Sequence, residues 1–290
     1  MSRQRQGSLV SYRPDIKVLD CTMRDGGLVN NFAFTDEFVK DLYLANIKAG
    51  VDYMEFGYKA SSEIFDPQKF GKWKFCKEKD IRDIVGDNKT DMKLSVMADV
   101  GRTDYKKDIL NKKDSVIDLI RVATYINTIK MLEEAKKKGY ETTVNIMAVS
   151  KVNDEELDAG LELLAQSSAD VIYLVDSFGA FYPEQIERLS DKYLNVAAKY
   201  NKKIGIHAHN NQQLAFANTI EALSRGVSYL DATMSGMGRG AGNCNMELLL
   251  GFLRNPKYSL NPVLKFLQNQ MLPLKKTGLV WGCDVQYMLT

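Results

Sequence analysis

The only two histidines of this chain, His207 and His209, lie two residues apart in the segment Gly-Ile-His-Ala-His-Asn-Asn. Residues two apart on a β-strand point to the same face, so both imidazoles can reach one metal ion if this segment ends a strand. By itself the pair is equally typical of a hydrogen-bonded structural pair, because short motifs also occur by chance. Two other segments favour the metal site.

Both of these segments place polar residues after a short apolar run. In Asp-Cys-Thr-Met-Arg-Asp-Gly-Gly, residues 20–27, Arg24 and Asp25 precede a glycine pair, and a turn carrying an exposed ion pair is the local alternative. The glycine-rich segment 235–243 ends at Asn243, whose amide oxygen can bind a cation. If the preceding strands are neighbours in a closed barrel, we expect these groups to converge with the two histidines.

Two imidazoles, the Asp25 carboxylate and the Asn243 amide form a mixed nitrogen and oxygen donor set that leaves about two positions of an octahedron open. Mn²⁺ and Mg²⁺ suit this set best, and Co²⁺ or Zn²⁺ also fit. A 2-oxo acid would chelate the ion through its keto and carboxylate oxygens, and the ion would act as a Lewis acid that stabilises an enolate. Arg24 would add positive charge beside the developing oxyanion.

Glu55 is a carboxylate inside an otherwise apolar run. A buried carboxylate without a partner is costly, so pairing with Arg24 is the economical explanation. The alternative is a side chain on the helix-facing side of the strand, bonded elsewhere.

Eight short runs rich in Val, Ile and Tyr must position these residues, and longer segments with helical spacing lie between them. They cover residues 16–20, 53–57, 93–98, 119–123, 142–148, 171–175, 203–208 and 229–232. Their starts lie about 25 to 40 residues apart, a spacing typical of a strand, a crossover helix and two loops. Eight such units predict a (β/α)₈ TIM barrel, although periodicity alone does not separate it from an open doubly wound sheet. We expect a flexible tail at 1–15, the barrel at 16–250 and a C-terminal helical extension at 251–290.

The composition excludes some partners and favours a compartment. With 39 Lys+Arg against 37 Asp+Glu, the net charge of +2 predicts neither nucleic acid nor a membrane surface as partner. No run approaches the length of a membrane span. The four cysteines are scattered, which favours a reducing, cytoplasmic location.

Taken together, these segments resemble the TIM-barrel metallolyase superfamily with the Asp-Arg-Glu signature, which includes HMG-CoA lyase, isopropylmalate synthase, homocitrate synthase and 4-hydroxy-2-oxovalerate aldolase. The motifs that carry the resemblance are LDCTMRDGG, YMEFGYKASS, VDSFGAFYP, IHAHNNQQLAFANTIEAL and GMGRGAGNCNMELL. The resemblance implies a metal site at Asp25, His207, His209 and Asn243. It also implies that Arg24 is the enolate-stabilising arginine and Glu55 the glutamate of the signature.

Three departures favour the aldolase branch and leave its general base open. The glycine loop 235–242 lacks the catalytic cysteine of the HMG-CoA lyases, and the chain is too short for the regulatory domain of isopropylmalate synthases. Leu28 stands where the hydroxyoxovalerate aldolases have a histidine base. The remaining candidates for a base or a substrate contact lie at the ends of other strands: Tyr58, Lys59, Asp99, Tyr125 and Asp176. A metal-bound water is a further candidate for the base.

We therefore predict a metal-dependent aldolase or lyase that makes or breaks a carbon–carbon bond next to a pyruvate-like 2-oxo acid. Its partners would be that small molecule, an aldehyde or acyl compound, and further copies of the chain. The alternatives are a Claisen-type synthase that uses acyl-CoA and a non-catalytic metal-binding barrel subunit. A nucleotide-binding oxidoreductase is also considered, because Gly236, Gly238 and Ala241 fit GxGxxG/A, although no Asp or Glu follows at about 20 residues.

Overall fold

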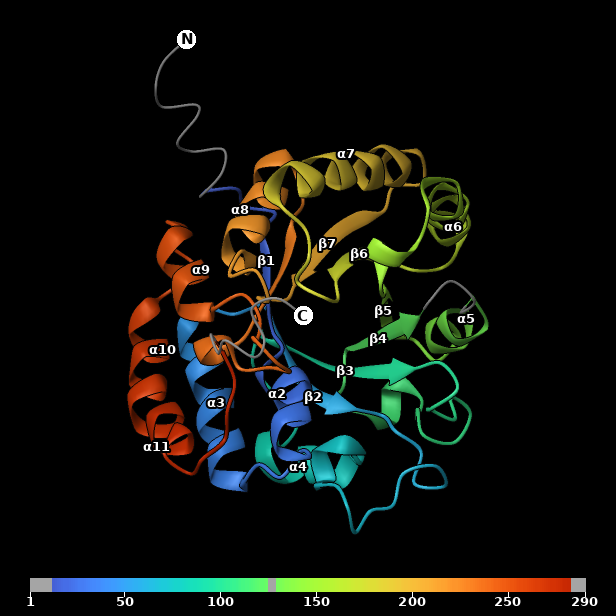
Figure 1. Cartoon of the computed structure of the whole chain (residues 1–290). Coiled ribbons are helices and arrows are strands. Elements are labelled where there is room, and N and C mark those ends of the chain that lie inside the picture. Colours follow the sequence, from blue (N-terminus) through green and yellow to red (C-terminus); the bar gives the residue numbers. More distant parts are fainter. Residues whose placement is uncertain (1–11, 125–128, 283–290) are drawn as a thin grey trace.

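A closed barrel of eight parallel strands forms the centre of the computed structural model, which describes residues 12–124 and 129–282 (Figure 1). The strands are β1 Lys17–Asp20, β2 Tyr53–Tyr58, β3 Lys93–Asp99, β4 Leu119–Thr124, β5 Glu141–Ile146, β6 Val171–Asp176, β7 Lys203–Ala208 and β8 Tyr229–Ala232. Each strand pairs with its neighbour in sequence, and β8 closes the ring by pairing in parallel with β1, where Asp231 lies opposite Leu19. The TIM barrel is therefore confirmed, and the open sheet is wrong.

The strands begin and end close to the predicted runs. β7 and β8 have the predicted bounds, whereas the fifth run, predicted at 142–148, forms Glu141–Ile146. The strand ends early because the chain turns at Ala148, whose φ of 54° lies in the left-handed region. Most strand residues are buried, as expected when a parallel sheet has side chains inside and helices outside.

Helices surround the barrel. They are α2 Thr22–Asn30, α3 Asp36–Ala49, α4 Glu78–Val85, α5 Ile129–Lys137, α6 Asp154–Gln166, α7 Pro183–Lys199 and α8 Ala215–Arg225. Their ends follow local chemistry: Thr35 accepts a hydrogen bond from the Phe38 N–H at the start of α3, and Pro183 begins α7 as predicted. Short 3₁₀ turns connect some elements, namely η1 Lys72–Lys74, η2 Lys112–Asp114, η3 Val149–Lys151 and η4 Met234–Gly236.

A C-terminal group of helices follows β8: α9 Met246–Phe252, α10 Leu260–Phe266, the π-turn η5 Leu267–Met271 and α11 Leu272–Lys275. α10 packs against α3, and Figure 1 shows this group along one side of the barrel. The predicted C-terminal helical extension is present. The tail predicted at 1–15 lies largely outside the described residues. No helix in the described part of the chain is long and apolar enough to cross a membrane.

Candidate metal centre

The predicted ligands meet at the C-terminal ends of the strands. Asp25 lies in α2, which starts directly after β1. His207 lies near the end of β7, and His209 follows this strand. The ligand atoms of these three residues all lie within 4.8 Å of one another. Each imidazole Nε2 is 3.8 Å from Asp25 Oδ2, and all three side chains are buried. The exposed turn considered for Arg24 and Asp25 is therefore wrong, because both residues are buried in a helix.

Asn243 joins the same cluster from the loop after β8. Its Nδ2 donates to Asp25 Oδ2 at 2.5 Å and to the Met237 carbonyl at 3.1 Å. Its Oδ1 is buried and has no hydrogen-bond partner in the part of the chain that the structure describes. A buried amide oxygen without a partner is costly, and a cation would satisfy it.

The glycine-rich loop has a packing role at this cluster. A Cβ on Gly238 would lie 2.1 Å from Asn243 Nδ2 and 2.8 Å from Asp25 Oδ2, so only glycine fits there. Gly236 adopts a φ of 61°, which glycine reaches without strain. The loop follows the last strand of a closed barrel, so in the described residues it lacks the βαβ unit of a dinucleotide motif. The oxidoreductase hypothesis is wrong for this reason.

The protonation states of the cluster suit a divalent cation. Burial alone would raise the pKa of Asp25, but the adjacent Arg24 guanidinium lowers it well below its usual range, so the carboxylate stays charged. Burial lowers the pKa of His209 to about 3, which keeps this imidazole neutral. His207 Nδ1 lies 3.0 Å from Asp231 Oδ2, and a proton on Nδ1 leaves the Nε2 lone pair facing Asp25. The cluster therefore offers the anionic oxygen of Asp25 and the neutral imidazole of His209, with His207 Nε2 beside them.

Arg24 connects this cluster to the second strand. Its Nε donates to Glu55 Oε2 and its Nη1 to Asp25 Oδ1, each at 3.0 Å. Glu55 is fully buried, so the guanidinium is held on both sides by carboxylates. Its Nη2 lies 3.5 Å from His207 Nε2, beside the ligand atoms.

Sequence reasoning missed two residues inside the barrel, Arg121 on β4 and Asp231 on β8. Arg121 is fully buried and donates to Glu55 Oε2 at 2.9 Å and to Asp231 Oδ2 at 2.6 Å. Its guanidinium also lies 4.5 Å from the centre of the Tyr173 ring. Burial opposes ionisation of Asp231, but Arg121 and the His207 hydrogen bond lower its pKa to about 2. A single charged residue in an apolar strand is the signal that identified Glu55, and it is present in both β4 and β8.

The residues predicted to contact substrate are distributed differently. Burial raises the pKa of Tyr58, and this residue lies within electrostatic range of Arg24 and Asp25. Burial also raises the pKa of Asp176 to about 6, although its carboxylate accepts hydrogen bonds from the backbone N–H groups of Ala180 and Phe181. Tyr125 lies outside the described residues.

Lys59 does not join the cluster. Its Nζ donates to the Cys76 carbonyl at 2.6 Å, and the residue lines a separate cavity of about 200 Å³. Asp99, considered as a base, lies 3.6 Å from Arg102 Nη1, and burial raises its pKa. Leu28 is 42% exposed on α2 and offers no titratable group.

The chain is similar to known proteins over most of its length. Residues 15–269 match the HMGL-like family. A 4-hydroxy-2-oxovalerate aldolase of Geobacillus genomosp. 3 is 30% identical over an alignment of 250 residues that covers 82% of this chain and 70% of the relative. An oxaloacetate decarboxylase of Mycobacterium tuberculosis is 28% identical over 245 residues, covering 82% of this chain and 69% of that protein.

Solved structures share the barrel. The N-terminal domain of a candidate aldolase from Bacteroides vulgatus superposes with a TM-score of 0.81 at 30% identity, covering 94% of this chain and 91% of that one. The carboxyl transferase domain of Rhizobium etli pyruvate carboxylase gives a TM-score of 0.71 at 13% identity, covering 98% of this chain and 52% of that one. At this lower identity, the similarity extends to the fold alone.

Proposed function

The chain belongs to the HMGL-like family, and we propose that its buried cluster holds a divalent metal ion at which a 2-oxo acid is bound for making or breaking a carbon–carbon bond. It is a carbon–carbon lyase: relatives named aldolase or decarboxylase are about 30% identical over most of the chain. Of the two reaction types in these names, we propose the aldolase. Pyruvate or a similar 2-oxo acid would be one component and an aldehyde the other.

The observation that carries the proposal is the donor set. Asp25, His207, His209 and Asn243 would hold the ion, and the buried Asn243 Oδ1 has no hydrogen-bond partner among the described residues. Oxygen and imidazole donors together suit Mn²⁺ or Mg²⁺, and Co²⁺ or Zn²⁺ also fit. When bound, such an ion supplies Lewis-acid polarisation of the keto group of a 2-oxo acid.

Arg24 is placed to stabilise negative charge that develops on the substrate oxygen. Its Nε and Nη1 are held by Glu55 and Asp25, so the orientation of the planar guanidinium is fixed. The Nη2 group remains beside the ligand cluster and can donate to a developing oxyanion without reorganisation.

The proton must be carried by a group other than histidine. Both imidazoles are directed to the ligand cluster, and Leu28 replaces the histidine base of the aldolases. Tyr58 and Asp99 end the neighbouring strands β2 and β3 within electrostatic range of Arg24, and we propose that the proton carrier is one of them.

Exchange of the pyruvate methyl protons tests this function directly. We expect protein loaded with Mn²⁺ to catalyse deuterium incorporation from D₂O into pyruvate, measured by proton NMR, and His207→Ala to lose about 100-fold or more of this rate. Metal analysis of both proteins shows whether the loss follows the ion. If the wild type shows no exchange with any of the four ions, or if His207→Ala equals it, the proposed function is wrong.

We also propose a cytoplasmic, homo-oligomeric enzyme. The cysteines in the described part of the chain, Cys21, Cys76 and Cys244, are all free and buried, which suits a reducing compartment. The C-terminal helices expose Leu264 and Leu272, which are 45% and 55% exposed and suit a contact between copies. Light scattering after size-exclusion chromatography measures the oligomeric state.

A further inference from the structure

The ammonium group of Lys74 is enclosed by aromatic rings. Lys74 lies in η1, on the connection between β2 and α4, and is only 6% exposed. Its Nζ lies between 4.4 and 5.7 Å from the centres of four rings, which belong to Phe32, Tyr58, Phe65 and Phe70. The faces of aromatic rings attract cations, so this cage favours the charged form of the lysine.

The ammonium group of Lys74 makes no hydrogen bond or ion pair with the described residues, which distinguishes it from that of its neighbour in the same turn. Lys72 is a third exposed and lies 2.6 Å from Asp36 Oδ1. Burial lowers the pKa of Lys74, as expected for an ammonium group removed from water. Its N–H donors are therefore unused, and a buried charge of this kind is costly unless an anion pairs with it.

The cage adjoins the metal centre. η1 packs against α2, which carries Arg24 and Asp25, and against β2. Tyr58 forms one wall of the cage and also lies within electrostatic range of both Arg24 and Asp25. A substrate held at the ligand cluster can therefore extend toward Lys74 at the same end of the barrel.

The charges around the cage leave one positive charge unpaired. Asp99 lies within electrostatic range of Lys74 and of Arg24, but its carboxylate is 3.6 Å from Arg102. Tyr58 is the other titratable group at the cage, and burial raises its pKa, so it stays neutral. Together Lys74, Arg102 and Asp99 have a net charge of +1, which matches one carboxylate better than a doubly charged phosphate.

We propose that Lys74 binds a carboxylate that the substrate carries at the end opposite its 2-oxo acid group. This inference rests on the proposed function, because the metal centre must hold the 2-oxo acid end. It names the substrate class: an aldol-type 2-oxo acid with a second, terminal carboxylate. The caged ammonium acts as a recognition group that favours dicarboxylates.

Binding measurements with matched ligands test the inference without requiring turnover. Isothermal titration of Mn²⁺-loaded protein would compare 2-oxoglutarate with 2-oxopentanoate, and 2-oxoadipate with 2-oxohexanoate. We expect the wild type to bind the dicarboxylate of at least one pair about tenfold more tightly, as a charge-assisted hydrogen bond in a buried site allows. Lys74→Met should remove this preference, and Lys74→Arg should keep part of it.

Lys72→Met is the matched control, because it makes the same substitution in the same turn at a lysine outside the cage. It should keep the wild-type preference. The inference is overturned if the wild type shows no preference in either pair, or if folded Lys74→Met retains it. If Lys74→Met does not fold, the ratios measured for the wild type, Lys74→Arg and Lys72→Met still decide.

The inference and the proposed function fail in different ways. A dicarboxylate preference that depends on Lys74, without exchange of pyruvate methyl protons, supports the recognition site and contradicts the lyase chemistry. Exchange of pyruvate methyl protons without a preference for dicarboxylates supports the lyase chemistry and overturns the recognition site. If no 2-oxo acid binds, both are overturned.

Discussion

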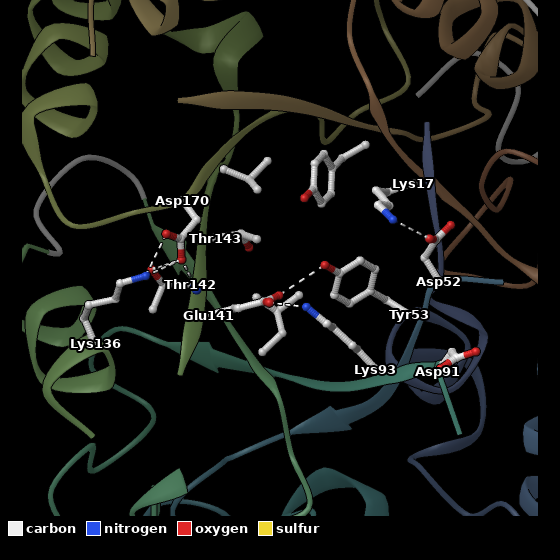
Figure 2. Close-up of a pocket in the computed structure, with 13 residues that line it drawn as sticks. Lys17, Asp52, Tyr53, Asp91, Lys93, Lys136, Glu141, Thr142, Thr143 and Asp170 are labelled. Atoms are coloured by element: carbon white, nitrogen blue, oxygen red, sulfur yellow. Dashed lines mark hydrogen bonds and ion pairs between the residues drawn. The ribbon is translucent and has the colours of Figure 1, made fainter. Parts of the chain in front are cut away.

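The two ends of the barrel both carry charged residues, but these residues are satisfied in different ways. At the N-terminal end of the strands, a cavity of about 370 Å³ is surrounded by charges that pair with one another (Figure 2). Lys136 Nζ lies 2.6 Å from Asp170, and Glu141 binds Lys93 and the Tyr53 hydroxyl. At the C-terminal end, Asp25 and two imidazoles lie together beside Asn243, whose buried amide oxygen has no partner among the described residues.

This difference shows that a buried group of converging ligand atoms indicates the site better than the presence of a cavity does. The side chains of Lys136 and Asp170 are more than 40% exposed, and water can replace their interaction. The groups at the other end are buried, and water cannot satisfy them as cheaply. The N-terminal cavity is therefore explained by stability, in agreement with the general division of labour in TIM barrels.

Replacement of the buried Arg121 should have the largest effect on stability. Arg121→Met leaves Glu55 without one of the two arginines that pair with it and Asp231 without Arg121, so we expect a loss of about 3–5 kcal/mol in the free energy of unfolding. Lys136→Met at the opposite end should cost about 0–1 kcal/mol, because its ion pair is exposed. Urea unfolding of the two variants measures both values, and equal losses would contradict the comparison between the two ends.

Asp231→Asn should have a smaller effect than Arg121→Met, and we expect this effect on metal affinity. The carboxylate accepts from His207 Nδ1 and so orients the ring, and an amide performs this role less well. We expect a loss of about 10- to 100-fold in Mn²⁺ affinity, measured by isothermal titration. Asp170→Asn, at the N-terminal end, is the matched control and should bind the ion as the wild type does. Unchanged affinity in Asp231→Asn would show that His207 is oriented without this contact.

The parts of the site that could be predicted from the sequence are those in which spacing within one strand decides the geometry. His207 and His209 are two residues apart, so the alternation of a strand already placed them on one face. The same rule does not hold at the end of β2, because the register shifts between Glu55 and Tyr58, and Lys59 follows the strand and binds the Cys76 carbonyl.

The remaining contacts depend on closure of the barrel and on packing between distant segments. Arg121 reaches Asp231 across the interior from strands 110 residues apart, which no local pattern specifies. The cage around Lys74 combines rings from the turn after α2, from β2 and from the loop that follows β2. The polar residues in β4 and β8 carried a signal, but their partners could not be named before the strand order was known.

The smallest expected effect is on the pH dependence of stability. It compares a buried carboxylate at the C-terminal end of the barrel with the carboxylates at the N-terminal end. Asp20, at the end of β1, is fully buried, and burial raises its pKa to about 6 although Thr22 and Asn46 donate hydrogen bonds to it. Since the ordinary value is 3.8, the folded protein binds this proton more tightly than the unfolded chain does. The stabilisation is therefore complete below about pH 4 and is lost as the pH rises through about 6.

In Asp20→Asn this contribution disappears, because an amide does not titrate in this range. Between pH 4 and pH 6, the stability of the variant relative to the wild type should rise by about 1 kcal/mol per pH unit, measured by urea unfolding in a buffer series. In the described residues, Asn46 Oδ1 is buried and has no partner. If the Asn46 amide rotates, this oxygen can accept a hydrogen bond from the introduced amide. Parallel stability curves for the two proteins would mean that Asp20 is ionised in the folded state, and that the C-terminal end tolerates a buried carboxylate held by neutral donors alone.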